Sequence, residues 1–316
     1  MKPMKDLSAN IAGLPINPAI TNASGIYPYP SMLKRLAEYD IGAVVTKSVT
    51  YDEREGHESP VFEKCSDGAY INAVGLSCPG YKQIKQELED AQPIRKPLIV
   101  SLAADTENEA IEMIEAFDGF ADAFEMNYSC PNISPGETCG MAIGKYPRRI
   151  ESLTRAAKES TKKPIITKLP PRGDRFEFLE SVDAAVSSGA DAISAINTIA
   201  DAMKINIEAK YPVLSNKYGG LSGHGIMPLG VGRVYMIREK YPDIPIGGIG
   251  GIKDAEDIIE YILAGADYVA IGTDLGIKTT IGAGEYLTSL IKKIEEYMDK
   301  NNIISLRELG GVAHEK

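Results

Sequence analysis

The sequence predicts an α/β fold, a (β/α)8 TIM barrel made by one domain over residues 1–316, with insertions at the C-terminal face of the barrel. Two observations lead to this prediction. Short apolar segments rich in Val, Ile, Leu and Ala recur along the chain, which is typical of parallel strands buried on both faces. Helical patterns separate most of them, and strand–helix alternation repeated about eight times favours a closed barrel over a doubly wound sheet.

The predicted strands are short and begin after a polar N-terminal segment. In chain order they are Ala19–Ala23, Ala43–Lys47, Leu98–Leu102, Ala123–Asn127, Ile165–Leu169, Ala192–Ile196, Ile244–Gly248 and Tyr268–Gly272. Each is an apolar run rather than an apolar–polar alternation, so both faces of each strand are expected to be covered.

Helix signals lie between these strands. Thr106 with Glu109 predicts a capping box, and Asp254 with Gly265 predicts the start and the end of a later helix. Apolar residues at helical spacing support these helices and two others: Ile111 and Ile114; Ile150, Leu153 and Ala157; Ala255, Ile258, Ile259 and Ile262; and Leu287, Leu290, Ile291, Ile294 and Met298.

Two segments interrupt the alternation, Tyr51–Lys85 and Met203–Leu229. Insertions that follow barrel strands lie at the catalytic face. We therefore expect both segments to cover an active site.

Composition limits the function. The chain has 316 residues, a formal net charge of −10, 44% hydrophobic residues and 25% charged residues, which is ordinary for a globular protein and excludes a disordered chain. The acidic balance argues against a nucleic-acid or membrane-surface protein. No apolar run reaches the ~18 residues of a membrane span. The N-terminal residues Met1–Asp6 are polar with no apolar signal region behind them, so a cytoplasmic protein is expected.

The metal-binding side chains are sparse. The chain has four cysteines, none of them in a C-x-x-C pair, and three histidines without ligand spacing. No zinc or iron–sulfur site is therefore predicted for this chain.

Polar residues collect at the predicted C-terminal strand ends, where barrel enzymes build their sites. These ends contain Lys47, Lys168, the amides of the Asn127–Asn132 segment, and Asn197 followed by Thr198. A lysine at such a place forms a Schiff base or holds negative charge on a ligand. The alternative for each lysine is an ordinary ion pair.

Glycines and one cysteine complete the set. Gly250-Gly251 and Gly272-Thr273 follow the last two strands, where backbone N–H groups bind phosphate in many barrels, although tight turns need the same glycines. Cys130 lies between Ser129 and Pro131 in a loop at the catalytic face. This position favours a reactive thiol or general base over a structural cysteine.

These residues resemble the motifs of the soluble class 1 dihydroorotate dehydrogenases. The resemblance runs from Asn22 to nearly the C-terminus, and the order and spacing of the motifs make it specific. The segments that carry it are Asn22-Ala23-Ser24-Gly25, Thr46-Lys47-Ser48, Ile71-Asn72-Ala73-Val74-Gly75-Leu76, Asn127–Asn132, Lys168, Asn197-Thr198, Gly219-Gly220-Leu221-Ser222-Gly223, Gly250-Gly251 and Gly272-Thr273.

The resemblance implies an FMN enzyme that oxidises dihydroorotate to orotate in pyrimidine synthesis. Cys130 would be the general base for the C5 proton while the hydride leaves C6 for FMN N5, with Lys47 and Lys168 as further catalytic residues. The implied FMN contacts are Ser24, Lys47, Ser48, Asn127, Lys168, Ile196, Gly223, Gly250, Gly251, Gly272 and Thr273. The implied substrate contacts are Lys47, Asn72, Ala73, Val74, Gly75, Leu76, Asn127, Asn132, Asn197 and Thr198.

The Asn197-Thr198 pair and the Pro212–Lys217 run are similar to the subclass that works with an electron-transfer subunit carrying FAD and an iron–sulfur cluster. The resemblance also implies a homodimer. Three places depart from the family pattern: Ser101 stands where relatives often carry Asn, Gly75-Leu76-Ser77-Cys78 replaces a Gly-Leu-Pro-Asn type of loop, and Ile133–Gly144 is longer than expected.

Three other functions stay open at this point. An FMN enzyme could act on another dihydropyrimidine such as dihydrouracil, although Asn132 stands where that relative often has His. A flavin-free barrel could use Lys168 as a Schiff-base nucleophile and Gly272-Thr273 as a phosphate site. A non-enzymatic binding barrel has no support beyond the fact that fold does not determine function.

Overall fold

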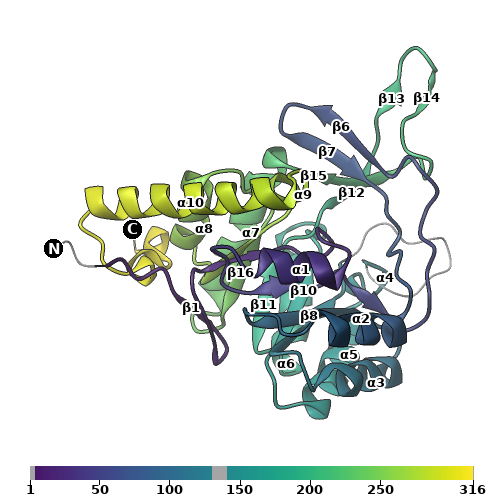
Figure 1. The fold of residues 1–316 in the computed structure, drawn as a ribbon, viewed down its shortest axis with the longest axis horizontal. Helices are drawn as coiled ribbons and strands as arrows, with labels where there is room; N and C mark the ends of the chain where they lie inside the picture. Colours follow the sequence, from purple (N-terminus) through teal and green to yellow (C-terminus); the bar gives the residue numbers. More distant parts are fainter. Residues whose placement is uncertain (1–3, 130–140, 316) are drawn as a thin grey trace.

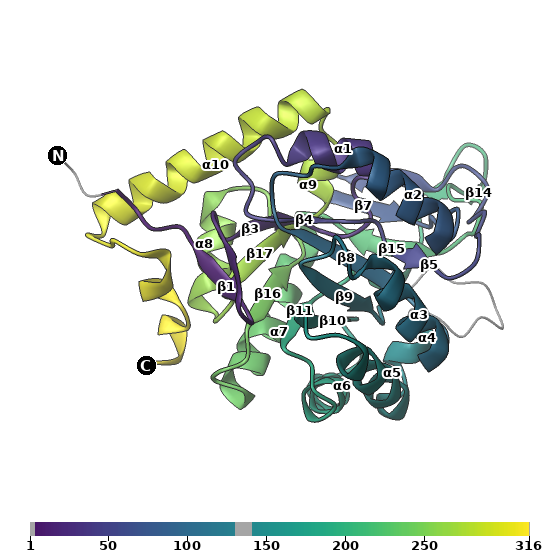
Figure 2. The same ribbon diagram turned by 60° about the horizontal axis from the view of Figure 1, so that its bottom comes forward.

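Eight parallel strands form the centre of the computed structural model, which describes residues 4–129 and 141–315. Neighbouring strands pair in the order β3 (Ile20–Asn22), β17 (Tyr268–Ile271), β16 (Ile246–Ile249), β11 (Ala192–Ala195), β10 (Ile165–Leu169), β9 (Ala123–Asn127), β8 (Leu98–Ala103) and β4 (Val44–Val45). A parallel bridge between Thr21 and Ala43 joins β3 to the β4 segment, so the sheet curves round into a barrel (Figure 2).

This architecture confirms the predicted (β/α)8 barrel. Each predicted strand differs from the observed one by no more than two residues at either end. The strands are buried on both faces, as their apolar runs predicted, and β8 has six buried residues in a row. A further short strand, β5 (Val49–Thr50), pairs with the end of β8.

Helices surround the barrel as a ring. Around it, consecutive contacts join α1 (Pro30–Leu36), α2 (Tyr81–Ala91), α3 (Glu107–Phe117), α5 (Pro147–Ser160), α6 (Arg175–Ser187), α7 (Met227–Lys240), α8 (Ala255–Leu263) and α10 (Thr280–Lys300), and α10 returns to α1. The short helices α4 (Met141–Gly144) and α9 (Thr273–Gly276) lie outside this ring. The apolar face of each ring helix packs on the strands, which places the core between the two layers.

The helix caps follow the predicted chemistry with one correction. Thr106 Oγ1 accepts from the backbone N–H of Glu109, but the Glu109 carboxylate accepts from the N–H of Asp105 instead of Thr106, so the predicted capping box is incomplete. Asp254 caps α8 and forms a complete box with Asp257. Gly265 follows the end of α8 in a left-handed conformation (φ +110°).

The two interrupting segments, together with the residues just before the second, form a small antiparallel sheet. Its strand order is β12 (Ile199–Ala202), β15 (Gly219–Ser222), β7 (Ala69–Asn72) and β6 (Phe62–Ser66). A hairpin of β13 (Ile205–Asn206) and β14 (Tyr211–Pro212) projects beyond it (Figure 1). The sequence predicted a cover made by these segments, but not that strands from both would pair.

The remaining elements are short. β1 (Ala9–Ile11) and β2 (Leu14–Ile16) form a hairpin before the barrel, and three 3-10 helices follow β15 and α10: His224–Ile226, Leu306–Leu309 and Val312–His314. Among the residues that the structure describes, no helix is long and apolar enough to cross a membrane.

Candidate active site

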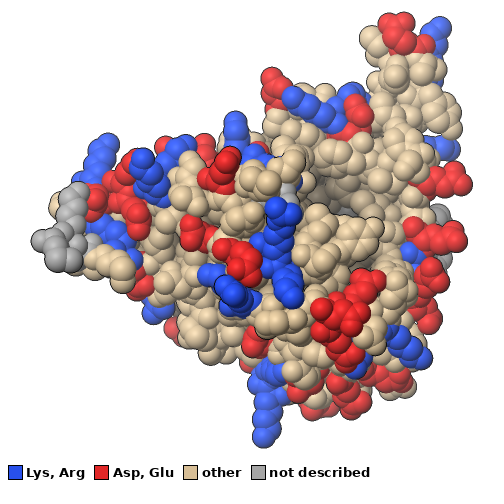
Figure 3. Space-filling model, viewed as in Figure 1, with Lys and Arg blue, Asp and Glu red and all other residues tan. Residues whose placement is uncertain are grey.

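A cavity of about 430 Å³ opens at the C-terminal ends of the barrel strands, beneath the small sheet. This volume is typical of pockets that hold a small molecule or cofactor. The molecular surface is hollowed between β15 and α1 on the face shown in Figure 3. Phe62, Asn72 and Ser222 of the small sheet contribute to the lining, so the insertions cover the site as expected.

Nearly all the predicted site residues that the structure describes line this one cavity. They are Ser24, Lys47, Ser48, Asn72, Val74, Gly75, Leu76, Asn127, Lys168, Ile196, Asn197, Thr198, Gly223, Gly250, Gly251, Gly272 and Thr273. These residues follow different barrel strands and both insertions, so only the fold brings them together. Cys130, Asn132 and most of Ile133–Gly144 lie outside the described residues.

Ala73 is the exception among the described residues. Its side chain is fully buried in a separate apolar cluster with Ile71 and Leu214, and Ala73 does not line the cavity. Side chains of an extended segment alternate between two faces. Asn72 and Val74 therefore face the cavity while Ala73 between them faces away.

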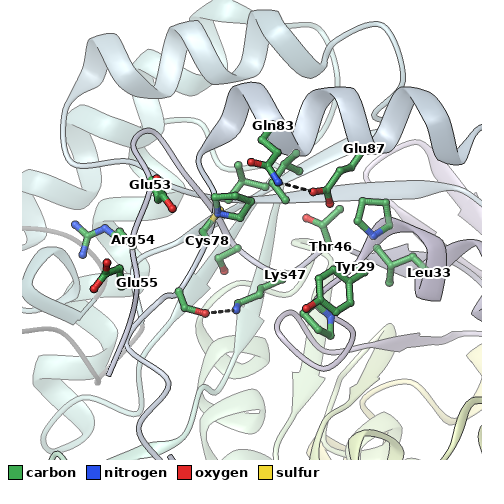
Figure 4. A pocket seen from close by; sticks show the side chains of 17 residues that line it. Tyr29, Leu33, Thr46, Lys47, Glu53, Arg54, Glu55, Cys78, Gln83 and Glu87 are labelled. Carbon is green, nitrogen blue, oxygen red and sulfur yellow. Dashed lines mark hydrogen bonds between the residues drawn. The ribbon is translucent and has the colours of Figure 1, made fainter. Parts of the chain in front are cut away.

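The two predicted lysines differ in burial. Lys168 projects from β10, is only 3% exposed, and its Nζ lies 3.9 Å from the Glu125 carboxylate. Lys47 is half-buried between β4 and β5 and donates a hydrogen bond of 3.0 Å to Ser77 Oγ. Lys47 also lines a second cavity of about 550 Å³, beside α1 and α2, which shares only Lys47 and Ser48 with the first (Figure 4).

A continuous set of hydrogen bonds underlies one side of the first cavity. Asn197 Nδ2 donates to Ser129 Oγ (3.0 Å), and Ser129 Oγ donates to Asn127 Oδ1 (2.7 Å). Asn127 Nδ2 donates to Ser48 Oγ (2.7 Å), which lies 3.0 Å from Ser101 Oγ. Ser101 Oγ then donates to Glu125 Oε1 (3.0 Å). We call Asn197, Ser129, Asn127, Ser48, Ser101 and Glu125 the relay.

Glu125 is a site residue that the sequence analysis missed. It lies inside β9 two residues before Asn127, so both side chains point to the barrel interior. Its carboxylate is 5% exposed and accepts hydrogen bonds from Ser101 and Ser194. Burial, followed by the charge of Glu125, raises the pKa of nearby Tyr268. The sequence signal that could have identified Glu125 was a charged residue inside an otherwise apolar strand.

The opposite side of the cavity is made of backbone. Gly250 (φ +120°) and Gly251 (φ +77°) follow β16 in conformations that favour glycine, and a Cβ on Gly251 would lie 2.6 Å from Met227 Cβ. The Tyr261 hydroxyl lies within hydrogen-bonding distance of the carbonyl oxygens of Ile249 (3.0 Å) and Gly250 (2.7 Å), which share its one hydrogen. Burial, then Asp257, raises the pKa of Tyr261, which keeps this hydroxyl a donor.

Gly272 and Thr273 adjoin this backbone surface at the start of α9. A Cβ on Gly272 would meet no atom closer than 3.7 Å, so the space beside Gly272 is open. The next residue, Asp274, carries a carboxyl whose pKa burial raises, against the opposing effects of Lys278 and Lys253.

The lining fits a flavin nucleotide. Ile26, Ile196, Ile226 and Ile249 provide an apolar slot, and the glycines provide a backbone surface at one end. The Thr198 hydroxyl lines the cavity and is buried without a hydrogen-bond partner among residues 4–129 and 141–315. Buried polar groups are normally paired, so this hydroxyl indicates a polar ligand. No cluster able to hold a metal ion occurs in residues 4–129 and 141–315.

Comparison with known proteins agrees with this geometry. The family model described as dihydroorotate dehydrogenase matches residues 6–298. The chain is 38% identical to the "Dihydroorotate dehydrogenase B (NAD(+)), catalytic subunit" of Thermococcus kodakarensis, over 98% of each chain. It is 36% identical to the protein of the same name from Pyrococcus abyssi, over 97% of this chain and 99% of that one.

The fold has a solved counterpart. A crystal structure of DHODH from Eimeria tenella in complex with ferulenol superposes with a TM-score of 0.81, covering 98% of this chain and 89% of that one at 21% identity. At that identity the likeness supports the fold alone. The near full-length family match and the identity to archaeal relatives go further, and together they show that this chain belongs to the dihydroorotate dehydrogenase family.

Proposed function

We propose that this chain oxidises dihydroorotate to orotate with FMN held in the 430 Å³ cavity, as the catalytic subunit of a larger assembly. The observation that carries the proposal is the convergence of a buried lysine, three asparagines and a glycine backbone surface on one cavity. Dihydroorotate has a carboxylate and a cyclic urea, and lysine with asparagine amides matches that set of donors and acceptors.

The oxidation removes a proton from C5 and a hydride from C6, and a carbon–carbon double bond forms between these atoms. Bound FMN supplies the acceptor for the hydride. Cys130 accepts the proton as its thiolate, by its resemblance to the family motif. Lys47, Asn72, Asn127, Asn132 and Asn197 hold and orient the substrate.

The chain's other residues hold the cofactor. Lys168 stabilises negative charge on the flavin ring, since its ammonium already lies in a buried, charge-compensated position beside Glu125. The same pairing favours a charge-holding lysine over the Schiff-base nucleophile of a flavin-free barrel. Ile196 covers the ring, and the backbone of Gly223, Gly250, Gly251, Gly272 and Thr273 binds the ribityl and phosphate groups. With its hydroxyl engaged on three sides, Ser48 acts by holding Ser24 and Asn127.

Anaerobic reduction of the flavin tests the reaction. The purified protein should be yellow and should bleach on addition of dihydroorotate. Cys130→Ala should keep its FMN but be reduced about 10²–10⁴-fold more slowly, the usual contribution of a general base. Cys65→Ala, which removes a free thiol outside the cavity, is the matched control and should be reduced at the normal rate.

Three outcomes would contradict parts of this proposal. Bleaching by dihydrouracil but not by dihydroorotate would move the substrate to another dihydropyrimidine. A Cys130→Ala variant that is reduced at the normal rate would remove Cys130 from the role of base. A colourless protein that cannot be reconstituted with FMN would favour the flavin-free barrel.

The relatives' names, with "catalytic subunit" and NAD(+), support a partner subunit that passes electrons to NAD. The family resemblance implies that this partner carries FAD and an iron–sulfur cluster. The isolated chain should therefore reduce an artificial acceptor such as ferricyanide with dihydroorotate, but not NAD. NADH formation by the isolated chain would contradict the need for a partner. Sedimentation of the chain alone tests the proposed homodimer.

A further inference from the structure

The directions of the hydrogen bonds in the relay can be worked out from what each group is able to donate. A serine hydroxyl has one hydrogen, and an ionised carboxylate has none. Ser101 gives its hydrogen to Glu125, so in the 3.0 Å contact between Ser48 and Ser101 the donor must be Ser48. Ser48 has then used its hydrogen and can only accept from Asn127 and from Ser24.

Every hydrogen bond of the relay therefore points toward Glu125. The order is Asn197 to Ser129 to Asn127, and then Asn127 to Ser48 to Ser101 to the carboxylate. The Asn127 carbonyl oxygen accepts from both the N–H and the hydroxyl of Ser129, while its amide nitrogen keeps one hydrogen that no described residue accepts. Asn127 can thus donate to a ligand in the cavity but has no free carbonyl lone pair to offer.

The same carboxylate faces the buried lysine of the cavity. Lys168 Nζ lies 3.9 Å from Glu125 Oε1, and register pairing places Lys168 beside Asn127 on the neighbouring strand. Ser194, opposite Lys168 on the next strand, donates to the other carboxylate oxygen at 3.3 Å and takes no part in the relay. Glu125 thus contacts both the relay and the cation, whereas Ser194 contacts only Glu125.

We propose that Glu125 is a positioning residue of this site: its carboxylate sets the direction of the Ser101 and Ser48 hydroxyls, so that Ser48 accepts from Asn127 and holds its amide in place for the ligand, and it balances the charge of Lys168. This inference rests on the proposed function, because it takes the ligand to be the flavin and its carbonyl-bearing substrate. Glu125 lies beneath the cavity lining and acts only through other side chains.

Three variants separate the two effects. Glu125→Gln keeps the shape and can keep an oxygen toward Ser101 while it removes the negative charge. Ser101→Ala interrupts the relay and keeps the charge. Ser194→Ala removes a hydroxyl from the other side of Glu125 and is the matched control. Thermal unfolding of each cofactor-free protein checks the fold.

The first readout is the redox equilibrium of the bound FMN, measured spectroelectrochemically. A reduced flavin carries negative charge near N1, and Lys168 stabilises it better when Glu125 no longer offsets the ammonium. Glu125→Gln should favour the reduced cofactor about tenfold, which is ~30 mV upward for a two-electron couple. Ser101→Ala and Ser194→Ala should leave the midpoint potential at the wild-type value.

The second readout is the KM for dihydroorotate. In Ser101→Ala, Ser48 loses its acceptor and no longer has to turn its lone pairs toward Asn127, so the Asn127 amide is held less firmly and KM for dihydroorotate should rise about tenfold with a smaller change in kcat. Ser194→Ala should keep the wild-type KM. Equal KM values in the two serine variants would overturn the directional relay, and this comparison holds even where Glu125→Gln does not fold.

An unchanged midpoint potential in folded Glu125→Gln would overturn the charge-balancing role. Failure of the proposed function looks different, because the wild-type protein would then bind no FMN or would not be reduced by dihydroorotate. Either result would be seen before any variant is compared.

Discussion

The two sides of the candidate active site are built in opposite ways. On the side of β8 to β11, side chains line and support the cavity, and hydrogen bonds and a buried ion pair hold them. On the side of β16 and β17, glycines present the backbone itself. Both sides lie at the C-terminal ends of buried parallel strands. The two sides therefore differ in residue type rather than in fold.

This difference teaches what each kind of recognition requires. A side-chain surface can distinguish donors from acceptors, but it must compensate a charge taken out of water. A backbone surface of N–H groups suits an anion, but it needs conformations and close approaches that only glycine tolerates. A flavin nucleotide, with a hydrogen-bonding ring at one end and a phosphate at the other, calls for both.

The largest loss of stability is expected from breaking the buried ion pair on the side of β8 to β11. Lys168→Met removes the ammonium and leaves the Glu125 carboxylate buried with only hydroxyl donors. Loss of one partner of a buried pair costs about 3–5 kcal/mol, so the free energy of unfolding of the cofactor-free protein should fall by that amount. Urea unfolding measures it.

The matched control is the double variant Lys168→Met with Glu125→Gln. If the unpaired carboxylate causes the loss, removing its charge should restore much of the stability, since contacting residues do not behave additively. A double variant less stable than Lys168→Met alone would show that packing, not charge, dominates this half.

An intermediate effect is expected on the glycine half. Gly251→Ala combines a left-handed φ of +77° with a Cβ that would lie 2.6 Å from Met227 Cβ and 2.8 Å from its backbone nitrogen. Strain and overpacking together should lower the free energy of unfolding by roughly 2–4 kcal/mol. Gly13→Ala has a similar φ of +98° and no atom within 4 Å, so it should show the strain alone. Equal losses in the two variants would exclude a contribution from the contact with Met227.

The barrel strands, several helix caps and the burial of Lys168 were predictable from the sequence, because each depends on residues close together in the chain. Barrel strands such as Ile165–Leu169 are continuous apolar runs, and the structure reproduces that strand at both ends. Asp254 is a strong cap because its carboxylate serves the first turn of the helix that follows it. The burial of Lys168 follows from its place at the end of such a strand.

The unpredicted parts depend on contacts between distant segments. β7 and β15 pair through Asn72 and Gly220, and neither strand has the apolar run of a barrel strand. Glu125 was missed for a related reason, because its role comes from Ser101, Lys168 and Ser194 on three other strands. A strand pattern shows that a side chain is buried but does not identify its partners.

The smallest effect on stability, and the sharpest test of the comparison, is expected at Gly272. Its φ is negative, unlike that of Gly251, and an added Cβ would meet nothing closer than 3.7 Å, so Gly272→Ala should lower the free energy of unfolding by less than about 1 kcal/mol. The Cβ would occupy open space at the predicted phosphate end, however. FMN affinity should therefore fall about tenfold, measured by fluorescence titration of the cofactor-free protein.

Gly119→Ala is the control for this variant, because a Cβ there also meets no atom within 4 Å and Gly119 lies outside the cavity. It should leave both stability and FMN affinity unchanged. Stability lost in Gly272→Ala would make this glycine a requirement of the fold, like Gly251. Unchanged FMN affinity would place the phosphate elsewhere, because a methyl group cannot share the space that the phosphate would need. The expected pair of results, normal stability with weakened binding, would separate the glycines that build the backbone surface from the glycine that keeps it open.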